Sequence, residues 1–449
     1  MNRRDFLATT ALATLGATLI PRTFAKSRER VRIGIIGTGL RGQVHLEELL
    51  KRNDVDISAI CDIEPAMLAA ALGQCDKAGR PKPRVFTGSD SAWQEMLAKA
   101  SLDAVLIATP WELHAPMAIG AMEAKVAVGC EVVAGITLDD HWQVLRTQLR
   151  TGTPYMLLEN VCYRRDVMAI LTMVRENLFG ELIHVQAGYQ HDLRGVKFNS
   201  GNPALPYERG AEFGAKGWSE ARWRTAHSVS RNADLYPSHG IGPAAMWLNI
   251  NRGNRFTRIG SFATKARGLR EYAAIVGGAD HPSARVKFAL GDVVTTQIAC
   301  ANGETILLQH DTNLPRPYSL GFRVQGTRGI WMDVNKSLYL EGKSPTPHRW
   351  EPAQEWLDKY DHPLWKRHAG KAENAGHGGM DFFVIHAFIE ALKAGAPMPI
   401  DIFDAVAWSA ITPLSEQSIR EGNRTLAFPD FTAGKWATRP PIFALDDRY

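Results

Sequence analysis

The sequence predicts a doubly wound α/β domain followed by an α+β domain with an open antiparallel β-sheet and helices. Three observations lead to this prediction. Apolar strand segments alternate with helical segments from about residue 30 to residue 160, a glycine-rich turn follows the first strand, and apolar and polar residues alternate at period two after about residue 180. At about 150 residues per domain, a chain of 449 residues also exceeds one ordinary domain. We place the first domain at 31–160 and the second at 161–449.

The first domain has the strand–helix alternation that is typical of a parallel sheet. Short runs rich in Val, Ile and Leu predict buried strands, and the amphipathic or Ala-rich stretches between them predict helices. The predicted strands are 31–37, 55–62, 102–110, 126–132 and 154–160, and the predicted helices are 41–53, 64–79, 114–125 and 138–152.

The second domain has a different pattern. Apolar and polar residues alternate, and Gly, Asp and Asn turn signals separate the segments, as in an open antiparallel sheet with one buried face. The predicted strands are 181–193, 255–266, 284–291, 292–303, 304–314, 321–329 and 329–342. We predict a long loop at 344–378, and two late helices at 377–395 and 401–422 that pack back on the first domain.

The first 25 residues predict an export signal. Arg3 and Arg4 precede Phe6, a short apolar stretch and a small-residue site that ends at Ala25. This order is typical of a twin-arginine signal peptide, and the apolar stretch is too short to span a membrane. We therefore expect the twin-arginine export machinery as a partner, a periplasmic or secreted mature protein, and no membrane span in that protein.

Composition narrows the function classes. The net charge is only +5 over 449 residues and the pI is near 8.9, so we expect no nucleic-acid partner. The five cysteines are odd in number and form no CxxC pair, which is typical of buried free thiols. The His, Cys and carboxylate residues show no metal-ligand spacing, so we predict no metal site.

The glycine-rich turn at 37–42 has the sequence GTGLRG, a GxGxxG pattern between a strand and a helix. This is the context of the Rossmann fingerprint for dinucleotides. Gly37 permits the tight turn, Gly39 lets the backbone approach a pyrophosphate, and Gly42 allows close packing of helix and strand. Asp62 ends the second strand, where a carboxylate binds the adenosine ribose and repels a 2′-phosphate. We therefore predict NAD as the cofactor.

Polar and aromatic side chains follow the later strands of the first domain. Parallel sheets of this kind bind ligands at the carboxyl ends of their strands, so these residues predict a nicotinamide pocket. Each of them taken alone also fits a structural role, such as loop packing or solvation. The residues are Thr109, Trp111, His114, Glu131, Glu159 and Asn160.

The second domain supplies candidates for the substrate: Tyr189, Arg224, Tyr236, His239 and Tyr318. Aromatic rings stack on sugar faces, and Arg and Tyr hydrogen-bond to hydroxyl or acetamido groups, so this set suits a polyhydroxylated ring. Tyr236 and His239 lie three residues apart before two glycines, and both side chains can transfer protons. A buried, hydrogen-bonded structural side chain is the alternative for each residue. The sequence has no evident pair of Asp or Glu residues placed for the ordinary two-carboxylate glycosidase mechanism.

The first domain resembles the Gfo/Idh/MocA oxidoreductases. Those enzymes carry Glu-Lys-Pro after the fifth strand, whereas this chain has Glu131-Val132-Val133 and so lacks the lysine. The whole chain is more similar to glycoside hydrolase family 109, the NAD-dependent α-N-acetylgalactosaminidases. That resemblance covers nearly the entire chain, and the matching segments are GTGLRG, WELH, GCEV, LLENVCYRRD, GYQHDLR, WRTAHSVSRNADLYPSHGIGP and LPRPYS.

The resemblance to family 109 implies two sets of site residues. The residues implied for the NAD site, beside the glycine loop, are Leu40, Arg41, Asp62, Trp111, His114, Glu131, Val132 and Asn160. The residues implied for the sugar site are Tyr189, Arg224, Tyr236, Pro237, Ser238, His239 and Tyr318.

The resemblance also implies a mechanism in which a tightly bound NAD is consumed and regenerated within one turnover. The terminal N-acetylgalactosamine, or a related aminosugar, is oxidised at C3, loses its C2 proton with the C1 leaving group, adds water and is reduced again. The acid–base work then falls to His239, Tyr236 and Tyr189. Two alternatives stay open, a periplasmic NAD-dependent sugar oxidoreductase and a non-catalytic NAD- or sugar-binding protein. The open sheet is also compatible with a homo-oligomer.

Overall fold

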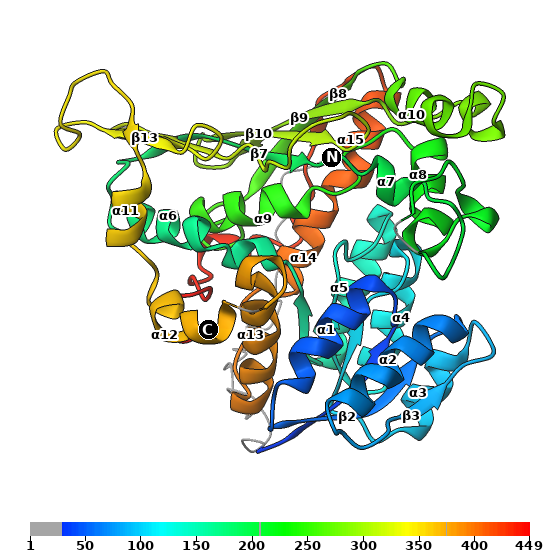
Figure 1. The fold of residues 1–449 in the computed structure, drawn as a ribbon. Coiled ribbons are helices and arrows are strands. Elements are labelled where there is room, and N and C mark those ends of the chain that lie inside the picture. Colours follow the sequence, from blue (N-terminus) through cyan, green and yellow to red (C-terminus); the bar gives the residue numbers. More distant parts are fainter. Residues whose placement is uncertain (1–28, 206–207, 374) are drawn as a thin grey trace, which may run out of the picture.

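Two β-sheets organise the protein (Figure 1). The computed structural model describes residues 29–205, 208–373 and 375–449, so the expected signal peptide at 1–25 lies outside the described residues. A six-stranded sheet belongs to the N-terminal part of the chain, and a nine-stranded sheet belongs to the remainder. This arrangement confirms the predicted fold class, a doubly wound α/β domain followed by an α+β domain.

The six-stranded sheet is entirely parallel and has the order β3-β2-β1-β4-β5-β6. Successive strands are added to one side of β1 up to β3 and to its other side from β4 on. A crevice forms between β1 and β4, at the carboxyl ends of the strands. β3 was not predicted, because a three-residue strand with one buried side chain carries no recognisable pattern. The strands are β1 (Val31–Ile36), β2 (Val55–Cys61), β3 (Arg84–Phe86), β4 (Ala104–Ile107), β5 (Ala127–Cys130) and β6 (Tyr155–Leu157).

Helices from both ends of the chain cover the six-stranded sheet. Five come from its own crossovers: α1 (Leu40–Leu50), α2 (Pro65–Lys77), α3 (Ala92–Lys99), α4 (Trp111–Glu123) and α5 (Leu138–Thr151). Two arrive from the C-terminal part of the chain. α13 (Met380–Ala394) packs against α1 and β1, and α14 (Ile402–Ser409) packs against α5 and β6. The parallel sheet is therefore buried by helices that are far apart in the sequence (Figure 1).

The larger sheet is mixed rather than purely antiparallel. β7 pairs in parallel with β10, and the other strand pairs are antiparallel. The sheet order is β14-β13-β12-β11-β7-β10-β9-β8-β15. Its strands are β7 (Leu182–Gln190), β8 (Phe256–Ala263), β9 (Val293–Cys300), β10 (Thr305–Asp311), β11 (Arg323–Gly326), β12 (Gly329–Met332), β13 (Ser337–Leu340), β14 (Glu351–Pro352) and β15 (Leu426–Ala427).

Two predictions in the second domain are wrong. The segment 284–291 is not a strand, because its apolar residue Phe288 packs in a separate aromatic cluster with Phe198 instead of pairing with a neighbour. The segment 344–378 is not one long loop. It contains β14 and two helices, α11 (Gln354–Lys359) and α12 (Pro363–Ala372), whose signals are hidden among Pro, His and Trp residues.

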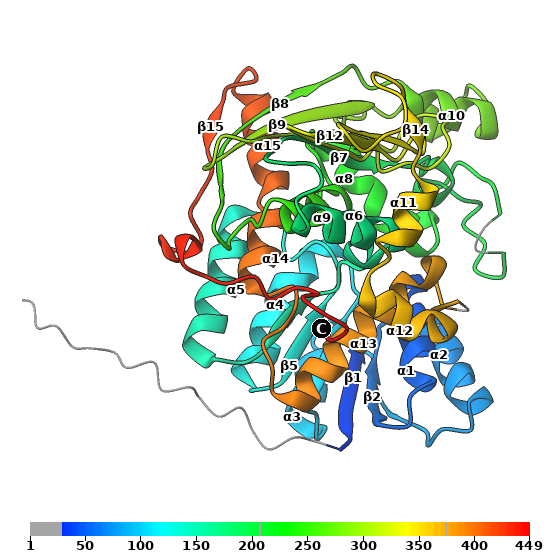
Figure 2. The same ribbon diagram turned by 90° about the vertical axis from the view of Figure 1, so that its left-hand side faces the viewer.

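Helices of the second domain lie between the two sheets (Figure 2). α9 packs against β7, and α15 packs against β8. The outer face of the larger sheet is open, since Phe262 on β8 is 62% exposed. No helix among the described residues is long and apolar enough to cross a membrane. The remaining helices are α6 (Arg165–Arg175), α7 (Arg194–Lys197), α8 (Arg224–Ser230), α9 (Ser238–Trp247), α10 (Gly268–Gly277) and α15 (Ile411–Arg420).

Candidate active site

A cavity of about 540 Å³ opens at the carboxyl ends of β1, β2, β4 and β5, and both domains contribute to its wall. The glycine loop and the ends of these strands form one side. Residues 218–224 and Tyr236 of the second domain form the other side. The predicted site residues that line it are Gly37, Gly39, Leu40, Arg41, Asp62, Thr109, Trp111, His114, Glu131, Val132, Arg224 and Tyr236.

The three glycines of the loop have different surroundings. Gly37 has φ +88°, and a Cβ there would lie 2.6 Å from the carbonyl oxygen of Ala108. A Cβ on Gly42 would collide with the carbonyl oxygen of Gly37. A Cβ on Gly39 would meet no protein atom within 4 Å. Gly37 and Gly42 are therefore required by the fold, whereas Gly39 leaves open space at the cavity wall.

This open space fits a dinucleotide. α1 begins directly after Gly39, and no side chain caps its first turn, so the N–H groups at the helix start are available for a pyrophosphate. Asp62 is held at the cavity wall, because its Oδ2 accepts hydrogen bonds from the Thr38 backbone N–H (2.6 Å) and hydroxyl (3.1 Å). Its Oδ1 accepts from the backbone N–H of Glu64 (2.9 Å). The residues present therefore match the donor and acceptor set that NAD requires.

A buried ionic network lies beside the glycine loop. Arg41 Nε donates to Glu131 Oε1 (2.6 Å), and its Nη1 lies 2.9 Å from Asp381 Oδ1. His45 Nε2 donates to Glu131 Oε1 (2.7 Å), and the side-chain amide of Asn160 donates to Asp381 Oδ1 (2.8 Å). Burial would raise the pKa of each carboxyl group, but the neighbouring Arg41 and His side chains hold the pKa of Glu131 and of Asp381 well below its usual range.

Asn160 was predicted from the sequence as a residue of the NAD site, whereas Asp381 was not. Asn160 does not line the cavity, and it acts on Arg41 only through Asp381. Asp381 has a fully buried side chain and was missed, although an Asp at the start of an apolar helical segment is a signal that could have been noticed.

His239 and Glu159 form a hydrogen-bonded pair between α9 and the end of β6. Nδ1 of His239 lies 2.7 Å from Oε1 and 2.9 Å from Oε2 of Glu159. Because a carboxylate only accepts, Nδ1 carries the hydrogen. No hydrogen bond to Nε2 of His239 is found among the described residues, so its lone pair is available to a substrate.

Two glycines of α9 make this pair possible. A Cβ on Gly240 would lie 2.6 Å from the backbone nitrogen of Gly188 on β7, so the helix and the strand touch through their backbones. A Cβ on Gly242 would lie 3.1 Å from Cγ of Glu159. The glycines after His239 therefore bring α9 against both β7 and Glu159.

Three predicted catalytic side chains contact one another. The ring centroid of Tyr189 lies 4.7 Å from that of Tyr236 and 5.1 Å from that of His239. The ring centroids of Tyr236 and His239 are 4.9 Å apart. Burial raises the pKa of both phenols, and Arg224 partly opposes this rise. Both tyrosines are therefore protonated in the resting site.

Arg224 and Tyr318 complete the predicted sugar site. Cζ of Arg224 lies 5.1 Å from the ring centroid of Trp111 and 5.1 Å from that of Tyr236. Both distances are within the range of a cation–π interaction. Tyr318 is 48% exposed and is linked to Tyr189 through His191. Pro237 and Ser238 form the start of α9, so the predicted turn is the first turn of a helix.

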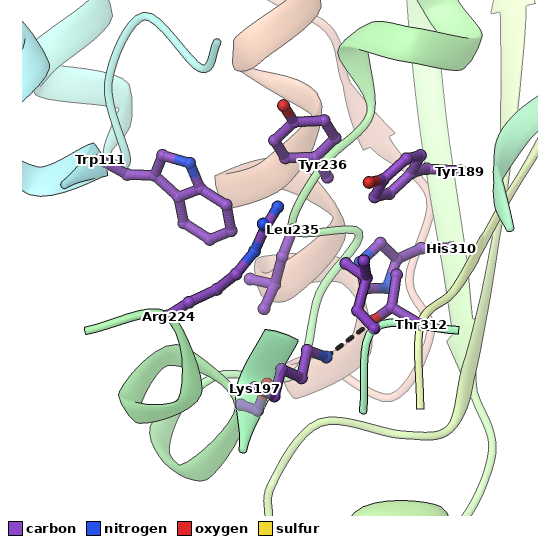
Figure 3. Close-up of a pocket in the computed structure, with 10 residues that line it drawn as sticks. Trp111, Tyr189, Lys197, Arg224, Leu235, Tyr236, His310 and Thr312 are labelled. Carbon is purple, nitrogen blue, oxygen red and sulfur yellow. Dashed lines mark hydrogen bonds between the residues drawn. The ribbon is translucent and has the colours of Figure 1, made fainter. Parts of the chain in front are cut away.

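Beneath these side chains lies a small cavity with room for about one water (Figure 3). Arg224, Tyr236 and Tyr189 line it from the side of the sugar site. Lys197 and His310 line it from below, and neither was singled out from the sequence. Lys197 Nζ donates to Thr312 Oγ1 at 2.8 Å (Figure 3), and burial holds the pKa of Lys197 well below its usual range.

The remaining predicted NAD-site residues form the floor of the large cavity. Two backbone carbonyl groups fix the ring of His114. Its Nδ1 lies 2.7 Å from the carbonyl oxygen of Val133, and its Nε2 lies 2.7 Å from the carbonyl oxygen of Thr109. Val132 occupies the position where Gfo/Idh/MocA oxidoreductases carry a lysine, and it contributes only an apolar surface. No lysine therefore lies at this strand end.

Two family models match the chain. The C-terminal domain of glycosyl hydrolase 109 matches residues 163–438, and an oxidoreductase family with an NAD-binding Rossmann fold matches residues 31–153. A glycosyl hydrolase family 109 protein of Stenotrophomonas maltophilia is 67% identical over 454 residues, which covers 100% of this chain and 99% of the relative. The chain belongs to glycoside hydrolase family 109.

Another relative of this family 109 chain is an α-N-acetylgalactosaminidase of Tannerella forsythia, 52% identical over 423 residues, or 94% of this chain and 90% of the relative. Levoglucosan dehydrogenase in complex with NADH and levoglucosan has a similar fold (TM-score 0.64, 18% identity, 89% of this chain and 100% of that chain). Scyllo-inositol dehydrogenase of Lactobacillus casei with bound NAD(H) and scyllo-inositol also has a similar fold. Its TM-score is 0.60 at 13% identity, and the match covers 89% of this chain and 99% of that chain. The family 109 chain is a glycoside hydrolase with an NAD-binding Rossmann domain.

Proposed function

We propose that this family 109 protein hydrolyses terminal N-acetylgalactosamine, or a related aminosugar, with a tightly bound NAD that is regenerated in each turnover. One observation carries the proposal. Tyr236 lines the dinucleotide-sized cavity and also contacts His239, so a sugar beside this tyrosine reaches both the cofactor site and a base. The name of the Tannerella forsythia relative supports the choice of aminosugar.

The residues that would hold NAD are those of the glycine loop, Asp62 and the strand ends at Trp111 and Glu131. When bound, NAD would take up the two electrons of the sugar C3–H bond and return them at the end of the cycle. This chemistry makes the C2 proton acidic next to a C3 ketone. The leaving group at C1 is then expelled by elimination and replaced by water.

His239 takes the proton of the C3 hydroxyl in this scheme. Glu159 fixes the ring, favours the tautomer with hydrogen on Nδ1, and stabilises the positive charge that the ring gains. The proton returns from the same nitrogen when the ketone is reduced. His239 is therefore both the base of the first step and the acid of the last.

Tyr236, which is protonated in the resting site, gives its hydroxyl proton to the departing C1 oxygen and takes the C2 proton in its place, and Tyr189 assists. The guanidinium of Arg224, 5.1 Å from the Tyr236 ring, lowers the cost of forming a phenolate in a buried site that otherwise disfavours it. The rings of Tyr189 and Tyr236 beside His239 also offer stacking faces for a sugar, and Arg224 offers hydrogen-bond donors for hydroxyl or acetamido oxygens.

Export of the folded protein is part of the proposal. The twin-arginine pattern at the N-terminus supports a periplasmic or secreted location. That route carries folded proteins, which suits an enzyme that must acquire its dinucleotide before leaving the cytoplasm.

A chromogenic assay tests the function. Purified enzyme is incubated with 4-nitrophenyl α- and β-N-acetylgalactosaminide and no added nicotinamide, and release of nitrophenol is expected from one anomer without net NADH formation. The rival function, a sugar oxidoreductase, requires the opposite result. If no aryl glycoside is cleaved while NADH accumulates with a free sugar, the glycosidase proposal fails.

A further inference from the structure

A short segment of the second domain closes one side of the large cavity. We call residues 218–224 the strap; it contains the 3-10 helix Ser219–Arg222, and most of its side chains line the cavity. The opposite wall is the glycine loop and the Asp62–Glu64 segment of the first domain. A ligand that fills the cavity is therefore enclosed between two domains.

Both ends of the strap are fixed to the second domain. At the start, the side-chain amide of Asn199 donates to the carbonyl of Trp218 (2.8 Å), and its Oδ1 accepts from the backbone N–H of Trp218 (3.0 Å). At the end, α8 begins at Arg224, and the next hydroxyl, that of Thr225, donates to the carbonyl of Lys197. The strap is thus a bridge with two anchored ends.

The middle of the strap contacts the first domain at two points. Arg222 forms an ion pair with Glu64, which lies two residues after Asp62 and donates its backbone N–H to that carboxylate. The ring of Trp223 packs edge-on against the ring of Trp111, with centroids 5.0 Å apart. The first contact lies over the adenosine end predicted by Asp62, and the second lies over the end toward the sugar site.

We propose that the strap is a clasp that retains the dinucleotide between turnovers, with Arg222 and Glu64 as its latch. This inference rests on the proposed function, since the regenerated cofactor must stay in place while sugars come and go. The enclosed ligand can leave only when Arg222 separates from Glu64 and the strap lifts. The latch touches solvent, with side chains 39% and 35% exposed, so it opens without unfolding either domain.

Exchange of the bound cofactor tests the clasp without any sugar. The holoenzyme is mixed with excess isotopically labelled NAD, and incorporation of the label is followed by rapid desalting. Arg222→Glu and Glu64→Arg, which each place like charges face to face, are expected to accelerate exchange about tenfold. The double variant Arg222→Glu/Glu64→Arg restores attraction and is expected to exchange within about twofold of the wild type.

Arg285→Glu is the matched control, because it removes an exposed ion pair with Asp280 in the same domain; its exchange rate should equal that of the wild type. The clasp is refuted if both single variants exchange at the wild-type rate, or if the double variant exchanges as fast as the singles. Faster exchange in an enzyme that cleaves no glycoside would uphold the clasp and reject the proposed function. A protein that binds no NAD would reject both.

Discussion

Nδ1 of His239 lies 2.7 Å from Oε1 of Glu159, although the two residues are 80 positions apart in the sequence. The carboxylate has a fully buried side chain, whereas the histidine side chain is 16% exposed. A buried carboxylate that holds one ring nitrogen leaves the other free for chemistry. In the proposed function, Glu159 is thus a positioning residue, and His239 is the group that would meet the substrate.

Replacement of Glu159 by Gln should separate positioning from binding. The amide keeps the shape but offers a weaker acceptor and no charge, so we expect kcat to fall roughly 100-fold to 1,000-fold while KM changes little. Glu416→Gln, at an ion pair with Arg231, is the control. An unchanged kcat, or a fall in kcat/KM caused by a higher KM alone, would contradict the assignment.

Two glycine substitutions should give opposite phenotypes. Gly42→Ala places a methyl group against the carbonyl oxygen of Gly37, so we expect a loss of more than about 2 kcal/mol in the free energy of unfolding. Gly39→Ala meets no protein atom, so stability should change by less than about 0.5 kcal/mol, whereas affinity for NAD should fall at least about tenfold. Urea unfolding and NAD titration measure the two quantities. Equal stability losses would show that Gly39 is structural.

Asp62 should control the choice between NAD and NADP. Asp62→Asn keeps one acceptor oxygen, for the backbone N–H of Thr38 or that of Glu64, and removes the charge that opposes a 2′-phosphate. We expect the ratio of NAD to NADP affinity to fall at least about tenfold, measured by calorimetry on the apoprotein. Asp90→Asn, also at the cavity wall, should leave the ratio unchanged.

Asp234 should make stability pH-dependent. Its carboxyl group is buried, and desolvation raises its pKa from 3.8 to about 7, although the backbone N–H of Tyr236 opposes this. A folded-state pKa above the unfolded value means that the stabilising contribution is fully present below pH 3.8 and is lost as the pH rises through about 7.

Asp234→Asn should remove this dependence. We expect the variant to exceed the wild type in free energy of unfolding at pH 8, by an amount of the order of 3–4 kcal/mol, and to differ little at pH 4. Urea unfolding at both pH values measures the difference. Asp139→Asn, whose side chain is 73% exposed, should show no such change. Parallel pH profiles for wild type and Asp234→Asn would contradict the argument.

Much of the fold could be predicted because its signals are local. The strand–glycine loop–helix unit and Asp62 lie within one short stretch, and their spacing alone identifies a dinucleotide site. The parallel pairing of β7 with β10 could not be predicted, because it depends on where the chain returns after a long excursion. The pairing of Asp381 with Arg41 could not be predicted for the same reason, since Arg41 lies in the first helix and meets Asp381 only when α13 folds back.

Individual residues for a sugar site were predicted from the sequence, but their arrangement in space was not. The structure brings Tyr189, Tyr236 and His239 into one cluster because Gly240 lets α9 touch β7. Spacing within one segment predicts that Tyr236 and His239 are close, but it carries no information about a strand elsewhere. The role of Glu159 as the partner of His239 likewise arises from tertiary packing.

The packing of α13 against α1 and β1 has a consequence for biosynthesis. The ribosome produces the glycine loop early, but α13, which carries one of the two counter-ions of Arg41, emerges only in the last part of the 449-residue chain. Until then, the apolar side chains of α1 and β1 that α13 buries stay exposed, and such surface makes a nascent chain prone to aggregation. The ionic network beside the glycine loop is therefore completed only when nearly the whole polypeptide has been synthesised.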